Sequence, residues 1–167
     1  MLNGNEWQQL HAEFLSDTQT LMCRADECLS HLELISDDRD AMECLLTTLQ
    51  QIAGEADTHG VETVCDFARQ LRYLLYFAHA AGQLQPKALH TLKCCFELMA
   101  WQLELIDPHT GSLALDDCEQ RDLLDAFACQ CGAGTRAQNV AVNPGWTVSG
   151  GKYDGLAPER ADHREAP

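Results

Sequence analysis

The chain lacks any long hydrophobic run. Its longest apolar stretches, such as the one from Tyr73 to Ala78, fall far short of the roughly 18 residues that cross a bilayer. Its first residues are not basic and no apolar stretch follows them, so we expect no secretory signal. These absences predict a soluble protein, with the cytoplasm as its default location.

Basic residues are also scarce. The 167 residues include 11 Lys and Arg against 26 Asp and Glu, which gives a net charge of −15. Residues 132–167 carry four acids and four bases, so the imbalance belongs to residues 1–131. A surface of this charge repels nucleic acid and anionic lipid. We therefore expect a protein partner.

The usual catalytic motifs are missing. The sequence has no Ser/His/Asp grouping, no glycine-rich loop of the kind that binds phosphate, and no His-Glu-x-x-His motif. We therefore expect neither enzymatic activity nor a bound cofactor.

Nine cysteines are present, and none forms a Cys-x-x-Cys pair. Without an export signal we expect reduced thiols that behave as small buried hydrophobic side chains. This prediction applies most directly to four cysteines on or near apolar helical stripes: Cys23, Cys28, Cys44 and Cys65.

The later cysteines allow an alternative function. Thiolates and imidazoles are zinc ligands, so a metal- or redox-responsive site is conceivable in the fourth and fifth helical segments. Its candidates are Cys94, Cys95, Cys118, Cys129 and Cys131. Their spacing argues against a zinc site, and we expect no metal.

Apolar residues recur at helical spacing through most of the chain, and no segment shows the alternation of a strand. The predicted helices cover Trp7–Ile35, about 40–56, 61–81, 86–106 and 116–127. Four long amphipathic helices with short connections predict an all-α fold, an antiparallel four-helix up-and-down bundle with a short fifth helix.

Specific residues mark the helix ends. The acid-rich stretch 36–40 supplies N-cap candidates, and Gly82 suits a left-handed C-terminal position. Pro86 suits a first helical turn. Asp116 with Glu119 three residues later indicates a capping box for the fifth helix.

The composition changes after Cys131 to Gly, Ala, Asn, Pro and Ser. We therefore predict one helical domain over residues 1–131 and a flexible tail over residues 132–167. Pro144-Gly145-Trp146 reads as a loop of that tail, or alternatively as a docking peptide for another protein.

Two glycines set these helices in the register of a known family. With Gly54 and Gly60 as reference points and Phe14 as a first-helix aromatic, the pattern resembles the histidine phosphotransfer (HPt) domain of chemotaxis-type histidine kinases. In that family a phosphorylated histidine on the second helix precedes Lys by three residues, Gly by four and a second Gly by ten. The alignment runs without a gap through Leu75, and helices of similar length follow.

The resemblance implies that three chemical groups have been replaced. Gln50 stands at the phosphoacceptor position, Ala53 at the lysine position and Arg72 at the acidic position of the third helix. Glutamine has no nucleophilic ring nitrogen, alanine removes a cation, and arginine reverses a charge. The resemblance therefore implies a degenerate HPt module without phosphotransfer.

Arg69 and Arg72 lie one helical turn apart, on the face expected beside Gln50. We interpret Gln50, Ala53, Arg69 and Arg72 as a partner-binding surface for a response-regulator receiver or a sensor histidine kinase. The alternative is that the arginines pair with neighbouring acids such as Asp66 or Glu55. A further alternative is an unrelated helical-bundle adaptor that binds a partner helix.

Three histidines could act as displaced phosphoacceptors: His59, His79 and His90. Each lacks the family's sequence context. We expect them to be surface or core residues.

Overall fold

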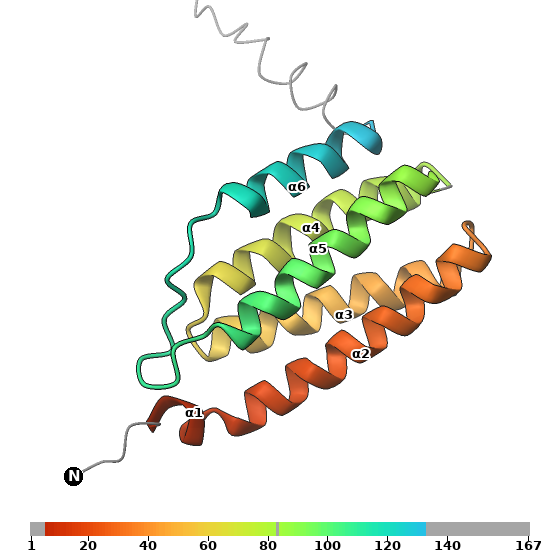
Figure 1. The fold of residues 1–167 in the computed structure, drawn as a ribbon. Coiled ribbons are helices and arrows are strands. Elements are labelled where there is room, and N and C mark those ends of the chain that lie inside the picture. The colour runs from red at the N-terminus through yellow and green to blue at the C-terminus, as the bar shows by residue number, and fades with distance from the viewer. Residues whose placement is uncertain (1–5, 83, 133–167) are drawn as a thin grey trace, which may run out of the picture.

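The computed structural model describes residues 6–82 and 84–132, and the regular elements in these ranges are all helices (Figure 1). They are α1 (Glu6–Leu10), α2 (Ala12–Leu34), α3 (Arg39–Thr58), α4 (Glu62–Ala80), α5 (Pro86–Glu104) and α6 (Cys118–Gln130). The all-α class is therefore confirmed. None of these helices combines the length and the apolar character that crossing a bilayer requires. The predicted tail, including Pro144-Gly145-Trp146, lies outside the described residues from position 133 onward.

The prediction of one continuous first helix is wrong. The backbone leaves the helical conformation at His11, where φ is −116° and ψ is 22°, so that α1 and α2 are separate. The turn brings α1 to the loop after α5, where the Gln8 backbone N–H donates to the Pro108 carbonyl at 3.0 Å. Leu10, expected on the buried stripe, is 79% exposed. The periodicity gave no warning because Trp7 and Leu10 continue the apolar spacing of α2 across the break.

Most predicted helix ends are confirmed. The Asp38 carboxylate accepts a hydrogen bond from the Ala41 amide at 3.1 Å, which caps α3. Pro86 occupies the first turn of α5, and Gly82 has a φ of +96° just beyond α4. These signals are local, so they can be read from sequence without knowledge of the packing.

The capping box predicted for α6 is wrong. The Asp116 carboxylate accepts from the Cys118 amide, two residues away, at 3.0 Å. This bond forms a turn ahead of the helix. The helix then begins at Cys118, with Asp117 at the N-cap and no side-chain capping bond.

The α3–α4 connection is tight. The Val61 amide donates back to the Ala56 carbonyl at 2.8 Å, and Gly60 takes a φ of +73° between them. This six-residue closure is a helix-ending motif that requires the left-handed conformation, which glycine adopts at little cost. It reverses the chain within three residues and fixes α4 beside α3.

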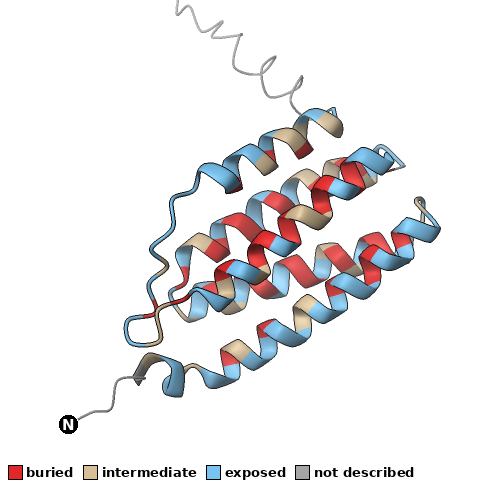
Figure 2. Ribbon diagram, viewed as in Figure 1, coloured by how far each residue is buried: buried red, intermediate tan, exposed pale blue. Residues whose placement is uncertain are grey.

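One core joins the helices. Helix α2 contacts α3 and α5, α3 contacts α4, and α6 contacts both α4 and α5. The buried residues of the long helices lie mainly on the sides that face their neighbours (Figure 2). Each large fully buried side chain contributes about 1.5–3 kcal/mol. Those side chains are Phe14, Phe67, Phe127, Leu29, Leu32, Leu45, Leu49, Ile52, Leu71, Leu75, Leu92 and Met99.

The cysteine prediction is confirmed in part. All nine thiols are free; Cys28 and Cys65 are buried as expected, whereas Cys44 is half-buried and Cys23 is exposed. Cys95 also lies in the core, and burial raises the pKa of its thiol to about 12. Cys95 therefore stays a neutral, inert side chain.

Candidate functional site

An open groove follows the seam between α3 and α4. Its volume is about 740 Å³. We call it the α3–α4 groove. Gln50, Ala53 and Gly54 of α3 line it together with Arg69, Arg72, Tyr73, Tyr76 and Phe77 of α4.

The structure brings every residue of the predicted partner-binding surface to this groove. Gln50 and Gly54 are exposed, whereas Ala53 is only 5% exposed. A methyl group added at Gly54 would meet no atom within 4 Å, so the space above this glycine is open. The side of α3 that lines the groove therefore carries short or uncharged side chains, and Gln50 and Gly54 are accessible to a partner.

Arg72 crosses the seam between the two helices. Its Nε donates a hydrogen bond to the Leu46 carbonyl of α3 at 3.2 Å, and its side chain is half-buried. Within residues 6–82 and 84–132, no carboxylate lies within ion-pair distance of its guanidinium. A half-buried cation without a carboxylate partner favours an acidic or polar group supplied from outside.

Arg69 has a carboxylate partner, but a different one from those that the sequence suggested. Its guanidinium lies 3.2 Å from the Asp57 carboxylate, rather than pairing with Asp66 or Glu55. Both side chains are more than half exposed. Ion pairs of this kind contribute at most about 1 kcal/mol, so a binding partner can displace the contact at little cost.

The sequence prediction missed three aromatic residues of the groove. Tyr73 is 63% exposed and Tyr76 is 58% exposed. Both rings contact Phe77 in a T-shaped arrangement, with centroid distances of 4.8 Å for Tyr73 and 6.0 Å for Tyr76. Large aromatic side chains are enriched at protein interfaces. One sequence signal was available: Tyr73 and Tyr76 fall outside the buried stripe of Leu71 and Leu75.

The residues that line the groove include no histidine, cysteine or carboxylate. Their polar groups are an amide, two guanidinium groups and two phenols. These groups bind and orient a ligand readily, but they supply no nucleophile or general base suited to neutral pH.

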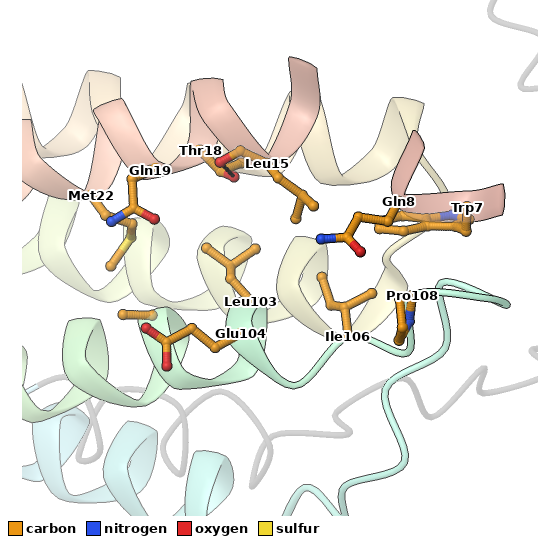
Figure 3. Close-up of a pocket in the computed structure, with 11 residues that line it drawn as sticks. Trp7, Gln8, Leu15, Thr18, Gln19, Met22, Leu103, Glu104, Ile106 and Pro108 are labelled. Atoms are coloured by element: carbon orange, nitrogen blue, oxygen red, sulfur yellow. Dashed lines mark hydrogen bonds between the residues drawn. The ribbon is translucent and has the colours of Figure 1, made fainter. Parts of the chain in front are cut away.

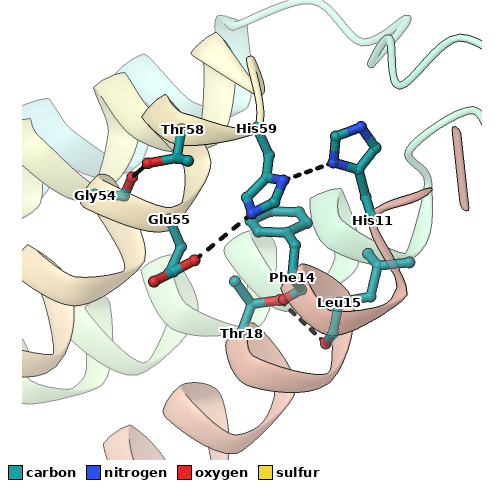
Figure 4. Close-up of polar contacts among 8 residues, drawn as sticks. All are labelled: His11, Phe14, Leu15, Thr18, Gly54, Glu55, Thr58 and His59. Carbon is teal, nitrogen blue, oxygen red and sulfur yellow. Dashed lines mark hydrogen bonds and ion pairs between the residues drawn. The ribbon is translucent and has the colours of Figure 1, made fainter.

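His59 is engaged elsewhere, at the C-terminal end of α3. Its Nδ1 lies 2.6 Å from Nδ1 of His11, and its Nε2 lies 3.8 Å from the Glu55 carboxylate (Figure 4). Both ring nitrogens therefore face protein groups, an arrangement that disfavours phosphorylation of this ring.

The other two histidines lie apart from the groove. His79 is half-buried and lines a small pocket with residues of the α2–α3 turn, including Asp37 and Arg39. His90 is exposed, and its Nε2 lies 3.9 Å from the Cys94 sulfur. Neither lies next to Gln50 among the lining residues.

The cysteines proposed as an alternative metal site have separate surroundings. Cys95 is in the core, Cys94 faces His90, and the Cys118 sulfur accepts from Arg121 at 3.7 Å. In the part of the chain that the structure describes, no three His, Cys, Asp or Glu side chains are grouped to hold a metal ion. Within the described residues, no grouping of side chains favours the metal- or redox-responsive alternative.

Comparison of the chain with protein-family models, curated proteins and solved structures gives no match.

Proposed function

We propose that this protein is a non-catalytic pseudo-HPt regulatory module. It binds a two-component or chemotaxis signalling protein through the α3–α4 groove and alters signalling without accepting phosphate. The observation that carries the proposal is the groove itself, which gathers Gln50, Ala53 and Arg72 beside exposed tyrosines and contains no nucleophilic side chain.

The proposal includes an architecture. The four long helices form an antiparallel up-and-down bundle of the HPt kind, with α6 as the short fifth helix. Contacts of α2 with α3 and α5, and of α4 with α3 and α5, support this arrangement because they close a ring of four helices. Helix α6 packs on α4 and α5 at one side of that ring.

The loss of phosphotransfer follows from the side chains in the groove. The Gln50 amide nitrogen is not nucleophilic, because its lone pair is delocalised into the carbonyl. Arg72 places a positive charge, anchored on α3, where a carboxylate would be needed to orient and polarise a histidine. A phosphoryl group has no acceptor at this position.

A binding role follows from the same residues. Arginine and tyrosine are the side chains most often found at the energetic centre of an interface. Here they lie on a domain whose other surface is strongly acidic, so the groove offers the chemistry for an acidic patch bordered by apolar residues. The acidic phosphoacceptor pocket of a receiver domain has this character, and a surface of a histidine kinase is the second possibility within the proposal.

Binding of the purified full-length protein to a panel of receiver domains and histidine kinases tests the proposal. We expect Arg72→Glu to weaken binding at least about tenfold, because it places a carboxylate against an acidic partner. Arg39→Glu is the matched control, since it makes the same charge change at an exposed site outside the groove. Failure to bind any member of either class would contradict the proposal, as would equal losses from both variants.

A further inference from the structure

A cluster of aromatic and imidazole rings joins three parts of the chain at one end of the molecule. His11, at the α1–α2 junction, meets His59 beyond α3, with 2.6 Å between their Nδ1 atoms (Figure 4). The His11 ring stacks on Trp7 at a centroid distance of 4.4 Å. The His59 ring lies against Phe14 at 4.8 Å. We call these four residues with Glu55 the histidine cluster.

Few contacts hold α1 in place. The Trp7 indole lies directly against Gly111 of the α5–α6 loop, where a side chain at position 111 would overlap it. The Gln8 backbone N–H donates to the Pro108 carbonyl at 3.0 Å. A helix of five residues has no stability of its own in water. Helix α1 therefore persists only while these contacts and the stacking on His11 are maintained.

Helix α1 also closes one end of the pocket between α2 and α5. Trp7 and Gln8 form that end, and the pocket encloses about 340 Å³ (Figure 3). Its apolar lining comes from both long helices and the loop that follows α5, namely Leu15, Met22, Leu103 and Ile106. Movement of α1 would open that end of the pocket further.

The contact between the two histidines depends on their protonation. A hydrogen bond between two Nδ1 atoms needs one N–H and one lone pair, so at least one ring must lack a proton on Nδ1. When both rings are fully protonated, two N–H groups and two positive charges face each other. The contact is then repulsive.

We propose that α1 is an acid-released lid over the pocket between α2 and α5. A protonated His59, with Glu55 beside its Nε2, still donates from Nδ1 to a neutral His11. Protonation of His11 removes that acceptor and releases α1. This regulation does not depend on the proposed function of the α3–α4 groove.

Burial lowers the pKa of His11 from the ordinary value of 6.5, and the neighbouring His59 lowers it further. A lowered pKa means that the docked state favours neutral His11. The stability of docking is therefore fully present above the pKa of a free histidine and is lost as the pH falls below it. Release is expected on the acid side of about pH 6.5.

The surrounding charges are few. Glu55 is the carboxylate within ion-pair distance of the imidazole pair, while Trp7 and Phe14, from α1 and α2, do not titrate. On the α5–α6 loop, the Asp107 carboxylate accepts from the amides of His109 and Thr110 within the loop. These hydrogen bonds lower the pKa of Asp107, so it stays charged throughout the window of release.

Glu13 at the start of α2 and Glu62 at the start of α4 are both exposed. Histidine is the side chain whose ordinary pKa places its change of charge between pH 7 and pH 5.

The test follows Trp7 fluorescence in the full chain with Trp101→Phe and Trp146→Phe, in buffer with EDTA, from pH 8 to pH 5. We expect the emission to shift to longer wavelength below pH 6.5, while far-UV circular dichroism shows that α2–α6 stay folded. His11→Gln should abolish the pH dependence, whether the lid stays docked or released. His109→Gln, which changes an exposed histidine of the adjacent loop, should leave the transition intact.

Nitrogen-15 NMR of the histidine rings provides a second readout in the unsubstituted chain. We expect His11 to titrate below the ordinary histidine value of 6.5, together with the change in Trp7 emission. An unchanged fluorescence transition in His11→Gln would overturn the proposal. So would a Trp7 signal that stays constant while His11 becomes protonated.

Discussion

The histidine cluster and the α3–α4 groove use opposite kinds of residue. The cluster contains two imidazoles and a carboxylate, which are common catalytic groups, but these groups face one another. The groove contains none of them, and it presents exposed tyrosines and a cation without a carboxylate partner among the described residues. The contrast shows that the engagement of a side chain, rather than its type, indicates whether it is available to a partner.

The largest expected effects separate binding from stability. Replacing both Tyr73 and Tyr76 by alanine should weaken partner binding at least about 30-fold, the loss typical of one interface hot spot. The free energy of unfolding should change by less than about 1 kcal/mol, because both side chains are mostly exposed. Titration calorimetry and urea denaturation measure the two quantities.

Trp7→Ala is the matched substitution in the histidine cluster. It should lower the free energy of unfolding by about 1–3 kcal/mol, because the half-buried indole packs on His11 and Gly111. Partner binding at pH 7.5 should be unchanged. If Trp7→Ala weakened binding as strongly as the tyrosine substitutions, the two regions would not be functionally distinct.

A pair of glycine substitutions tests the same contrast at smaller magnitude. Gly111→Ala should destabilise the protein by about 1–3 kcal/mol, because φ is +71° and the new methyl group would overlap the Trp7 indole. Gly54→Ala should stabilise it by about 0.5–1 kcal/mol, because the residue is helical and the space above it is open. Thermal denaturation compares the two. Equal effects would contradict the difference between the crowded position at Gly111 and the open position at Gly54.

Local sequence signals predicted most of the fold. The apolar periodicity gave the long helices, and Asp38, Gly82 and Pro86 marked ends that the structure confirms. The break at His11 was not predictable in the same way. The contacts on either side of it, His11 with His59 and Gln8 with Pro108, join residues that are distant in sequence.

The smallest expected effect concerns phosphotransfer. Gln50→His places a histidine at the exposed position on α3 that the proposed HPt register assigns to the phosphoacceptor, but Ala53 and Arg72 leave the site without the cation and the carboxylate of the HPt pattern. We expect no acid-labile phosphate on this variant, as on the unsubstituted chain, after incubation with a phosphorylated receiver or an active kinase. Labelling of Gln50→His would show that the residue at position 50 alone decides whether this site accepts phosphate.

The candidate site was predictable only in part. The register defined by Gly54 and Gly60 indicated that Gln50, Ala53 and Arg72 would share a surface, and the structure brings them to one groove. The tyrosines were missed because aromatic residues in a helix are usually assigned to the core. Their exposure follows from the turn at Gly60, which fixes the face that α4 turns toward α3.

The bond from Arg72 to the Leu46 carbonyl has a consequence for the chemistry that position 72 tolerates. A guanidinium has five N–H donors in a rigid plane, and this bond uses the one on Nε. The two terminal nitrogens keep four donors for another molecule. A lysine has a single nitrogen at the end of its chain, so it would have to choose between tying α4 to α3 and meeting a ligand. Arginine at this position can hold α4 to α3 and hydrogen-bond a ligand at the same time.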